Sequence, residues 1–181
     1  MKKENRRSAY TKSIIKQSML AILKNKPVYK ITVTEICNFA NINRSTFYAY
    51  YYDPYDLFNA MQDDFIELLQ NTVSQSIGSK NIIYDFLMTI ANNMEASKVF
   101  LGPHGDRTFI NKIEPFARDK VSYFFSIRAN FVSQAQIDYY YTFIKGGIAL
   151  IIDKWIQNGL QEPPQTVANN ILVILNKLTN R

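Results

Sequence analysis

Apolar positions along this chain recur at steps of three and four residues, which is the spacing of one face of an α-helix. The first such stretch predicts a helix over residues 8–25, ended by Pro27. Its buried face is expected to hold Ile15, Met19, Ile22 and Leu23. Tyr29, after the break, is expected to pack under the next helix.

Two short helices joined by a tight turn are predicted over residues 32–52, and the rest of the chain is organised around them. Thr32 and Glu35 have the T-x-x-E spacing of a capping box, which predicts the start of the first helix. Its buried face is predicted to contain Val33, Ile36, Cys37 and Ala40. Asn41 and Asn43 favour a turn, and Asn43 is expected to cap a second helix over residues 44–51.

The second of these helices separates apolar from polar side chains. The residues with core spacing are Phe47, Tyr50 and Tyr51. The residues on or near the open face are Arg44, Ser45, Thr46, Tyr48 and Ala49. A helix, a sharp turn and a second helix that exposes arginine, hydroxyls and tyrosine form the layout of a helix-turn-helix that reads DNA.

At this point the sequence ITVTEICNFANINRSTFYAYYYDPYDLF resembles the N-terminal domain of TetR-family transcriptional regulators. The matching positions are Ile31, Thr32, Val33, Ile36, Ala40, Ile42, Ser45, Thr46, Phe47, Tyr48, Tyr51 and Leu57. Two positions depart from the family pattern. Pro54 stands where many members have a lysine that reaches a phosphate, and Asn41 stands where a small residue, often glycine, is usual. Asn can adopt left-handed geometry in its place.

The resemblance implies an all-α protein of about nine helices. An N-terminal three-helix domain with the helix-turn-helix would span residues 1–53, and a larger helical domain for effector binding and dimerisation would span residues 54–181. The predicted DNA contacts are Lys3, Arg6, Arg7, Thr32, Thr34, Arg44, Ser45, Thr46, Tyr48 and Tyr52. Arg44 suits a guanine edge or a phosphate, and Tyr48 resembles the family tyrosine that hydrogen-bonds the DNA backbone. The alternative for the tyrosines is a place in the core, which is favoured for Tyr50 and Tyr51.

Positive charge is concentrated in the segment that holds the helix-turn-helix. Residues 1–52 contain ten Lys and Arg against Glu4 and Glu35, a net charge of +8, whereas residues 53–181 carry a net charge of −2. A basic tail without a motif would indicate only a solvated segment. Beside this motif, the charge is the footprint expected of a protein that binds the phosphate backbone.

Helical spacing continues after residue 53. Asp53 and Pro54 are expected to cap and start a long helix that reaches about residue 77 and ends at Gly78-Ser79. Further helices are predicted over about residues 82–97, 107–113 and 116–127, from Ser133 to Asn158-Gly159, and after Pro163-Pro164. The last two have more apolar surface than one core needs, which predicts a homodimer built as a four-helix bundle. The predicted interface residues are Ile144, Gly147, Ile148, Ile151, Trp155, Ile171, Ile174 and Leu178. A purely internal core is the alternative for these side chains.

Residues suited to catalysis or to binding a metal are scarce. The chain has one histidine, His104, and one cysteine, Cys37, which lies on an apolar helical face. No metal, no cofactor and no enzymatic activity are therefore expected, and no apolar run approaches the ~20 residues that span a bilayer. A cytoplasmic protein without a membrane partner is expected.

The leading hypothesis is a dimeric sequence-specific DNA-binding regulator, expected to be a repressor that binds a palindromic double-stranded operator. A small apolar effector would release it. The first alternative is a helical interaction protein of TetR-like fold that acts through protein partners, and the second is a small all-helical enzyme.

Overall fold

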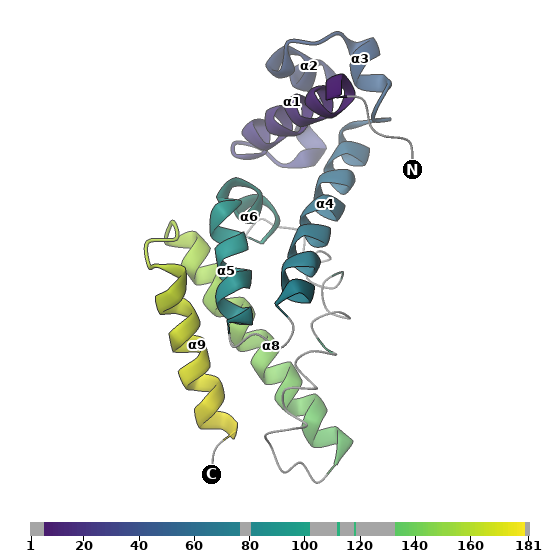
Figure 1. Cartoon of the computed structure of the whole chain (residues 1–181). Coiled ribbons are helices and arrows are strands. Elements are labelled where there is room, and N and C mark those ends of the chain that lie inside the picture. The colour runs from purple at the N-terminus through teal and green to yellow at the C-terminus, as the bar shows by residue number, and fades with distance from the viewer. Residues whose placement is uncertain (1–5, 77–80, 102–111, 113–117, 119–132, 180–181) are drawn as a thin grey trace. The chain divides into compact units, whose positions relative to one another are not determined.

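The structure is a computed structural model that describes residues 6–76, 81–101, 112, 118 and 133–179 (Figure 1). Regular structure in these ranges consists of eight α-helices and one short 3-10 helix, which confirms the predicted all-α class. Contacts divide the chain into two units, residues 1–65 and 66–181, so the division falls within α4 (Pro54–Gln75). The predicted domain boundary at residue 53 coincides with the start of that helix.

Three α-helices and the 3-10 helix precede α4 in the first unit. They are α1 (Arg6–Leu23), η1 (Val28–Lys30), α2 (Val33–Ala40) and α3 (Arg44–Tyr48), with α1 packed on α2 and α2 on α3. The core includes Ile15, Met19 and Ile22 of α1, as predicted. Tyr29 does not pack under α2, because η1 leaves it 67% exposed and buries Ile31 instead.

The turn between α2 and α3 has the geometry that its asparagines predict. Asn41 ends α2 in the left-handed conformation (φ 50°, ψ 50°), and the Ile42 N–H donates to the Cys37 carbonyl at 3.0 Å. Asn43 stands at the N-cap of α3, but its side chain makes no capping hydrogen bond there, contrary to expectation. The helix ends at Tyr48, earlier than predicted, because the Tyr50 and Tyr51 N–H groups both turn back to the Phe47 carbonyl.

Two aspartates fix the start of α4. The Asp53 carboxylate accepts from the Asp56 N–H, and the Asp56 carboxylate accepts from the Tyr52 N–H, both at 2.8 Å. Pro54 occupies the first helical position, where a missing N–H costs nothing. This start agrees with the prediction, whereas the predicted end at residues 77–79 lies outside the described residues.

The second unit contains α5 (Ile82–Asn92), α6 (Met94–Phe100), α8 (Gln134–Gln157) and α9 (Pro164–Thr179), with α5 packed on α9 and α6 on α8. The single helix predicted over residues 82–97 is wrong, because Asn93 separates α5 from α6. Its side-chain amide donates to the Thr89 carbonyl at 2.9 Å, and the buried Ser97 hydroxyl donates to the Ile90 carbonyl at 2.9 Å. Both carbonyls also accept from the Asn93 N–H at 3.2 Å, so these side chains add second hydrogen bonds at the break.

Both ends of α8 follow sequence signals. The Ser133 hydroxyl accepts from the Gln136 N–H at the start. At the end Gly159 has φ 72°, and the Leu160 N–H donates to the Trp155 carbonyl at 2.9 Å, which is a Schellman motif. The Trp155 indole N–H donates to the Glu162 carbonyl at 2.8 Å and so fixes the loop before α9.

Several predictions fall on parts of the chain that the structure does not describe. They are Lys3, His104, and the helices at 107–113 and 116–127 apart from Lys112 and Arg118, which are both helical. Within the described ranges, none of the helices combines the length and the apolar character needed to cross a membrane.

Candidate nucleic-acid interface

The helix α3 has one side in the core and one side in solvent. Phe47 is fully buried, and Tyr51 just after the helix is 7% exposed. Arg44 and Ser45 are exposed, Thr46 is half-buried, and Tyr48 is 57% exposed. The Tyr48 ring stands edge-on to Phe47 with 5.7 Å between centroids, so the core orients an exposed tyrosine.

Arg44 is connected to the preceding helix. Its Nη2 donates to the Thr34 hydroxyl at 2.5 Å, and Thr34 lies exposed in the first turn of α2. Two predicted DNA contacts from different helices therefore lie side by side.

The start of α2 is stabilised by the predicted capping box. The Thr32 hydroxyl accepts from the Glu35 N–H at 3.3 Å, and the Glu35 carboxylate accepts from the Thr32 N–H at 3.4 Å. Lys26 forms an ion pair with Glu35. The hydrogen bond from Lys26 lowers the pKa of Glu35 most; burial raises this pKa to a lesser extent, and the bonds from Thr32 lower it further. The Thr32 hydroxyl thus has a structural task, whereas Thr34 beside it does not cap the helix.

The first turn of α1 lies beside α3. An open depression of about 460 Å³ is lined on one side by Arg7, Ser8 and Thr11 and on the other by Ser45, Thr46, Ala49 and Tyr50. Lys12 lies 5.9 Å from the centre of the Tyr50 ring. The structure therefore brings Arg7 together with the hydroxyls of α3. Arg6 is exposed at the start of α1, and Tyr52 is 83% exposed beyond α3.

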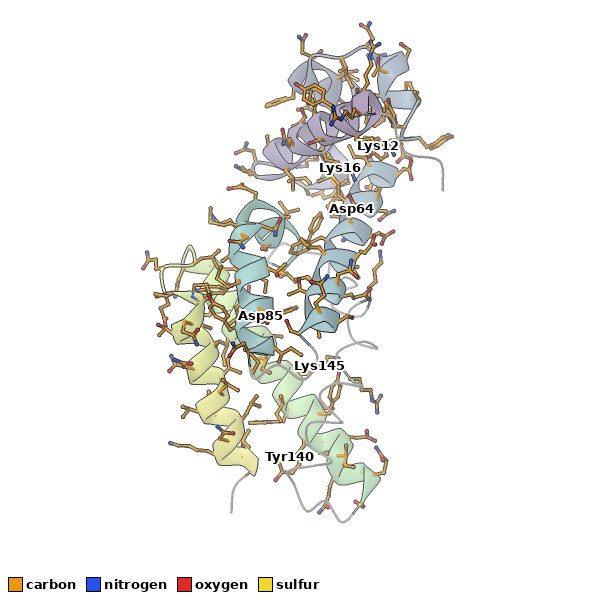
Figure 2. The ribbon with its side chains drawn as sticks, viewed as in Figure 1. Lys12, Lys16, Asp64, Asp85, Tyr140 and Lys145 are labelled. Carbon is orange, nitrogen blue, oxygen red and sulfur yellow. The ribbon has the colours of Figure 1, made fainter. Side chains whose placement is uncertain are left out.

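Some of the positive charge in this unit is offset internally. Lys16 of α1 pairs with Asp64 of α4 (Figure 2), and Lys26 pairs with Glu35. Arg44 is held by a neutral hydroxyl instead, so its charge is not cancelled by its partner. The count of Lys and Arg in residues 1–52 therefore overstates the number of cations that can meet phosphates.

The residues predicted for a dimer interface divide into two groups. Ile144, Trp155 and Ile171 are each at most 4% exposed in the single chain, so they have little surface left for a partner. Ile148, Ile151 and Leu178 are half-buried, Gly147 is exposed, and Ile174 is 46% exposed.

Sequence reasoning missed part of the exposed apolar surface. Phe143, Leu150 and Val173 are 68%, 70% and 52% exposed, and none of them is among the predicted interface residues. Phe143, Gly147 and Leu150 follow one another at steps of four and three, which places them on one face of α8. An added Cβ at Gly147 would meet no atom within 4 Å, so this face has room at its centre. Helical spacing could have grouped these residues but could not show which face the chain leaves uncovered.

A family model described as "Transcriptional regulator C-terminal region", of the TetR type, matches residues 78–177, more than half of the chain. This chain belongs to the TetR family of transcriptional regulators. The family predicted from residues 31–58 is thereby confirmed by a different part of the chain. A search among curated proteins gave no match.

Solved structures share the fold of this TetR-family regulator over nearly its whole length. The TetR transcriptional regulator from Streptococcus agalactiae 2603V is 18% identical, with a TM-score of 0.70 over 93% of this chain and 95% of that one. The dihydroxyacetone kinase operon activator DhaS is 21% identical, with a TM-score of 0.67 over 93% and 96%. NalD, a secondary repressor of a multidrug efflux pump in Pseudomonas aeruginosa, is 14% identical, with a TM-score of 0.65 over 94% and 96%.

Proposed function

We propose that this TetR-family regulator is a dimeric, sequence-specific DNA-binding repressor. One observation carries the proposal: α3 exposes Arg44, Ser45 and Tyr48, while Phe47 of the same helix is fully buried. A short helix that exposes a planar cation, a hydroxyl and a phenol has the donors needed to read base edges and hold phosphates in a major groove.

Each exposed group has a distinct task in this proposal. Arg44 reads a guanine edge, while Ser45 and Thr46 contact bases or backbone. The Tyr48 hydroxyl donates to a phosphate. Arg6 and Arg7 contact the backbone next to the groove, because the depression places the first turn of α1 beside α3.

The dimer in this proposal is built on α8 and α9. The face of Phe143, Gly147 and Leu150 on α8 and the exposed Val173 and Ile174 on α9 meet the same surfaces of a second copy. A two-fold axis makes such an interface self-complementary and presents two copies of α3 to one duplex. The operator is therefore a palindrome.

Repression follows from occupying a promoter, and a small apolar effector relieves it. Proteins of this fold include one named an activator and one named a repressor. A reporter assay therefore tests whether this protein represses or activates transcription. Expression from the operator-bearing promoter is expected to rise when the gene is deleted. A fall in expression would make the protein an activator.

Salt titration tests DNA binding itself. Arg6 and Arg7 of two subunits supply up to about four phosphate contacts, so affinity for a generic duplex is expected to fall about 10²-fold between ~50 and ~200 mM salt. Fluorescence anisotropy of a labelled duplex measures this slope. A flat response would contradict the proposal and favour the helical protein that acts through protein partners.

A further inference from the structure

Arg44 is exposed, but its side chain has a defined position. The guanidinium Nη2 donates to the Thr34 hydroxyl at 2.5 Å, which connects α3 with α2 across the turn. A long arginine side chain loses rotamer freedom when it binds, and a bond already made in the unbound protein reduces that loss.

We propose that Thr34 is a positioning residue that sets the base preference of Arg44, an assignment that rests on the proposed function. The guanidinium has more N–H donors than the bond to Thr34 uses, and they are arranged in a rigid plane. Fixing one edge of that plane to α2 therefore fixes the direction of the remaining donors, and a guanine presents two acceptors in one such direction.

The chemistry of Thr34 suits this task because a hydroxyl can both accept and donate. Its oxygen accepts from Arg44, so its own proton remains available for a phosphate oxygen on the DNA backbone. Thr34 then connects a contact to the DNA backbone with the contact of Arg44 to a base. The position of the bound phosphate therefore determines where the Arg44 guanidinium points.

A neutral partner is important here. Lys16 and Lys26 of the same unit are paired with carboxylates, which offset their charge. Glu35, next to Thr34, is bonded to Lys26 and Thr32. Arg44 thus keeps the full positive charge that attracts DNA while its side chain is held in place.

The test uses the full chain and two substitutions at one position. Thr34→Val keeps the branched shape and removes the hydroxyl, whereas Thr34→Ser keeps the hydroxyl. Affinities are measured for a duplex selected by the wild type and for its single base-pair variants. The pair read by Arg44 is the one at which Arg44→Ala abolishes the preference.

At that base pair, Thr34→Val is expected to reduce the preference about threefold to tenfold, the cost of ordering a side chain on binding. Thr34→Ser is expected to restore most of it. For Thr34→Val, the preferences at other base pairs are expected to remain. Its affinity for every duplex is expected to fall by the same factor, because the contact of Thr34 with a phosphate is lost. The double variant Thr34→Val/Arg44→Ala is expected to lose no more preference than Arg44→Ala alone. Equal thermal unfolding of the variants shows that the fold is kept.

Four results would overturn the assignment. An unchanged profile for Thr34→Val would show that Thr34 does not position Arg44. A sharper profile would show that the hydroxyl holds Arg44 away from DNA. A wild-type preference that Arg44→Ala leaves intact would remove Arg44 as the reader. A wild type with no base preference anywhere contradicts the proposed function as well, so the two failures are distinguishable.

Discussion

The two units of the chain expose different kinds of large side chain. In the first unit the exposed large hydrophobic residues are five tyrosines and one phenylalanine: Tyr10, Tyr29, Tyr48, Tyr52, Tyr55 and Phe39. On α8 and α9 the exposed large hydrophobic residues include Tyr139 and Tyr140, but four others have no polar side-chain atom: Phe143, Leu150, Val173 and Ile174. A phenol can contact a hydrated, charged partner, whereas an exposed Phe or Leu gains only from a dry one. The difference favours the proposed DNA contacts for the first unit and the proposed dimer for the second.

The units also differ in how closely local sequence determines their structure. The turns around α2 and α3 have their own signals, namely the capping box at Thr32, the left-handed Asn41 and the paired Asp53 and Asp56. The face of Phe143 and Leu150 on α8 stays exposed among the residues that the structure describes. Local signals therefore account for the turns of the first unit, whereas the apolar face of the second unit is the surface that the proposed dimer would cover.

The strongest test of this contrast places charge on the apolar face of α8. Phe143→Asp/Leu150→Asp is expected to weaken dimerisation at least about 100-fold, because an unpaired charge in an apolar interface costs several kcal/mol. Sedimentation velocity measures the association. Thr142→Asp, an exposed polar position on the same helix, is the matched control. A double variant that stays dimeric would show that this face is not the interface.

Loss of Arg44 is the next largest effect. Arg44→Ala is expected to reduce preference for the selected operator by about 5- to 150-fold, which corresponds to the ~1–3 kcal/mol of one good base contact. Circular dichroism should be unchanged because the side chain is exposed. Lys16→Ala removes a cation that already has a carboxylate partner, and a much smaller effect is expected. Equal losses for the two variants would mean that charge alone determines binding.

The adjacent glycines of α8 sharpen the assignment of the face. Gly146→Ala and Gly147→Ala should each raise the stability of the single chain by up to ~1 kcal/mol, because alanine favours a helix interior and the added Cβ meets open space. Gly146 and Gly147 both lie between Phe143 and Leu150 at helical spacing, so each alanine is expected to weaken a dimer that packs closely on this face. Dimers that are strengthened by both substitutions would argue against close approach at these glycines.

The smallest expected effect concerns the pH dependence of the first unit. The hydrogen bond from Lys26 lowers the pKa of folded Glu35, so its contribution to stability is present above the unfolded pKa of ~4.3 and is lost as pH falls through the folded value. The gap in unfolding free energy between the wild type and Glu35→Gln should therefore narrow from pH ~6 to pH ~3. Urea titration measures it, and a constant gap would rule out this source of stability.

Much of the first unit could be predicted from the sequence because its signals are local. The Thr32–Glu35 spacing, Asn41 and Asp53-Pro54 each act over a few residues, and the structure has all three as expected. The prediction for Tyr29 was wrong because the burial of its side chain depends on how η1 turns the backbone. The Arg44–Thr34 bond was not foreseen, because it joins positions whose distance depends on the angle between α2 and α3.

The second unit was harder to predict because periodicity identifies a helix without showing what covers each face. The pattern over residues 82–97 was continuous, yet the backbone of Asn93 leaves the helical conformation (φ −118°, ψ 41°) and divides the helix there. On α8 the apolar periodicity predicted Ile144 and Trp155 as interface residues, and both are buried within the chain. Which apolar stripe faces inward depends on the packing of α5, α6 and α9, which no local signal encodes.

The central claim is that an exposed helix beginning at Arg44 enters a DNA groove and that a dimer presents two copies of it. Selection of bound duplexes from a random pool tests both parts at once. The predicted result is an inverted repeat whose half-site centres lie about one helical turn, ~34–36 Å, or a multiple of it apart, bound by two or more chains. Recovery of no enriched sequence, or of a lone half-site bound by one chain, would contradict the account.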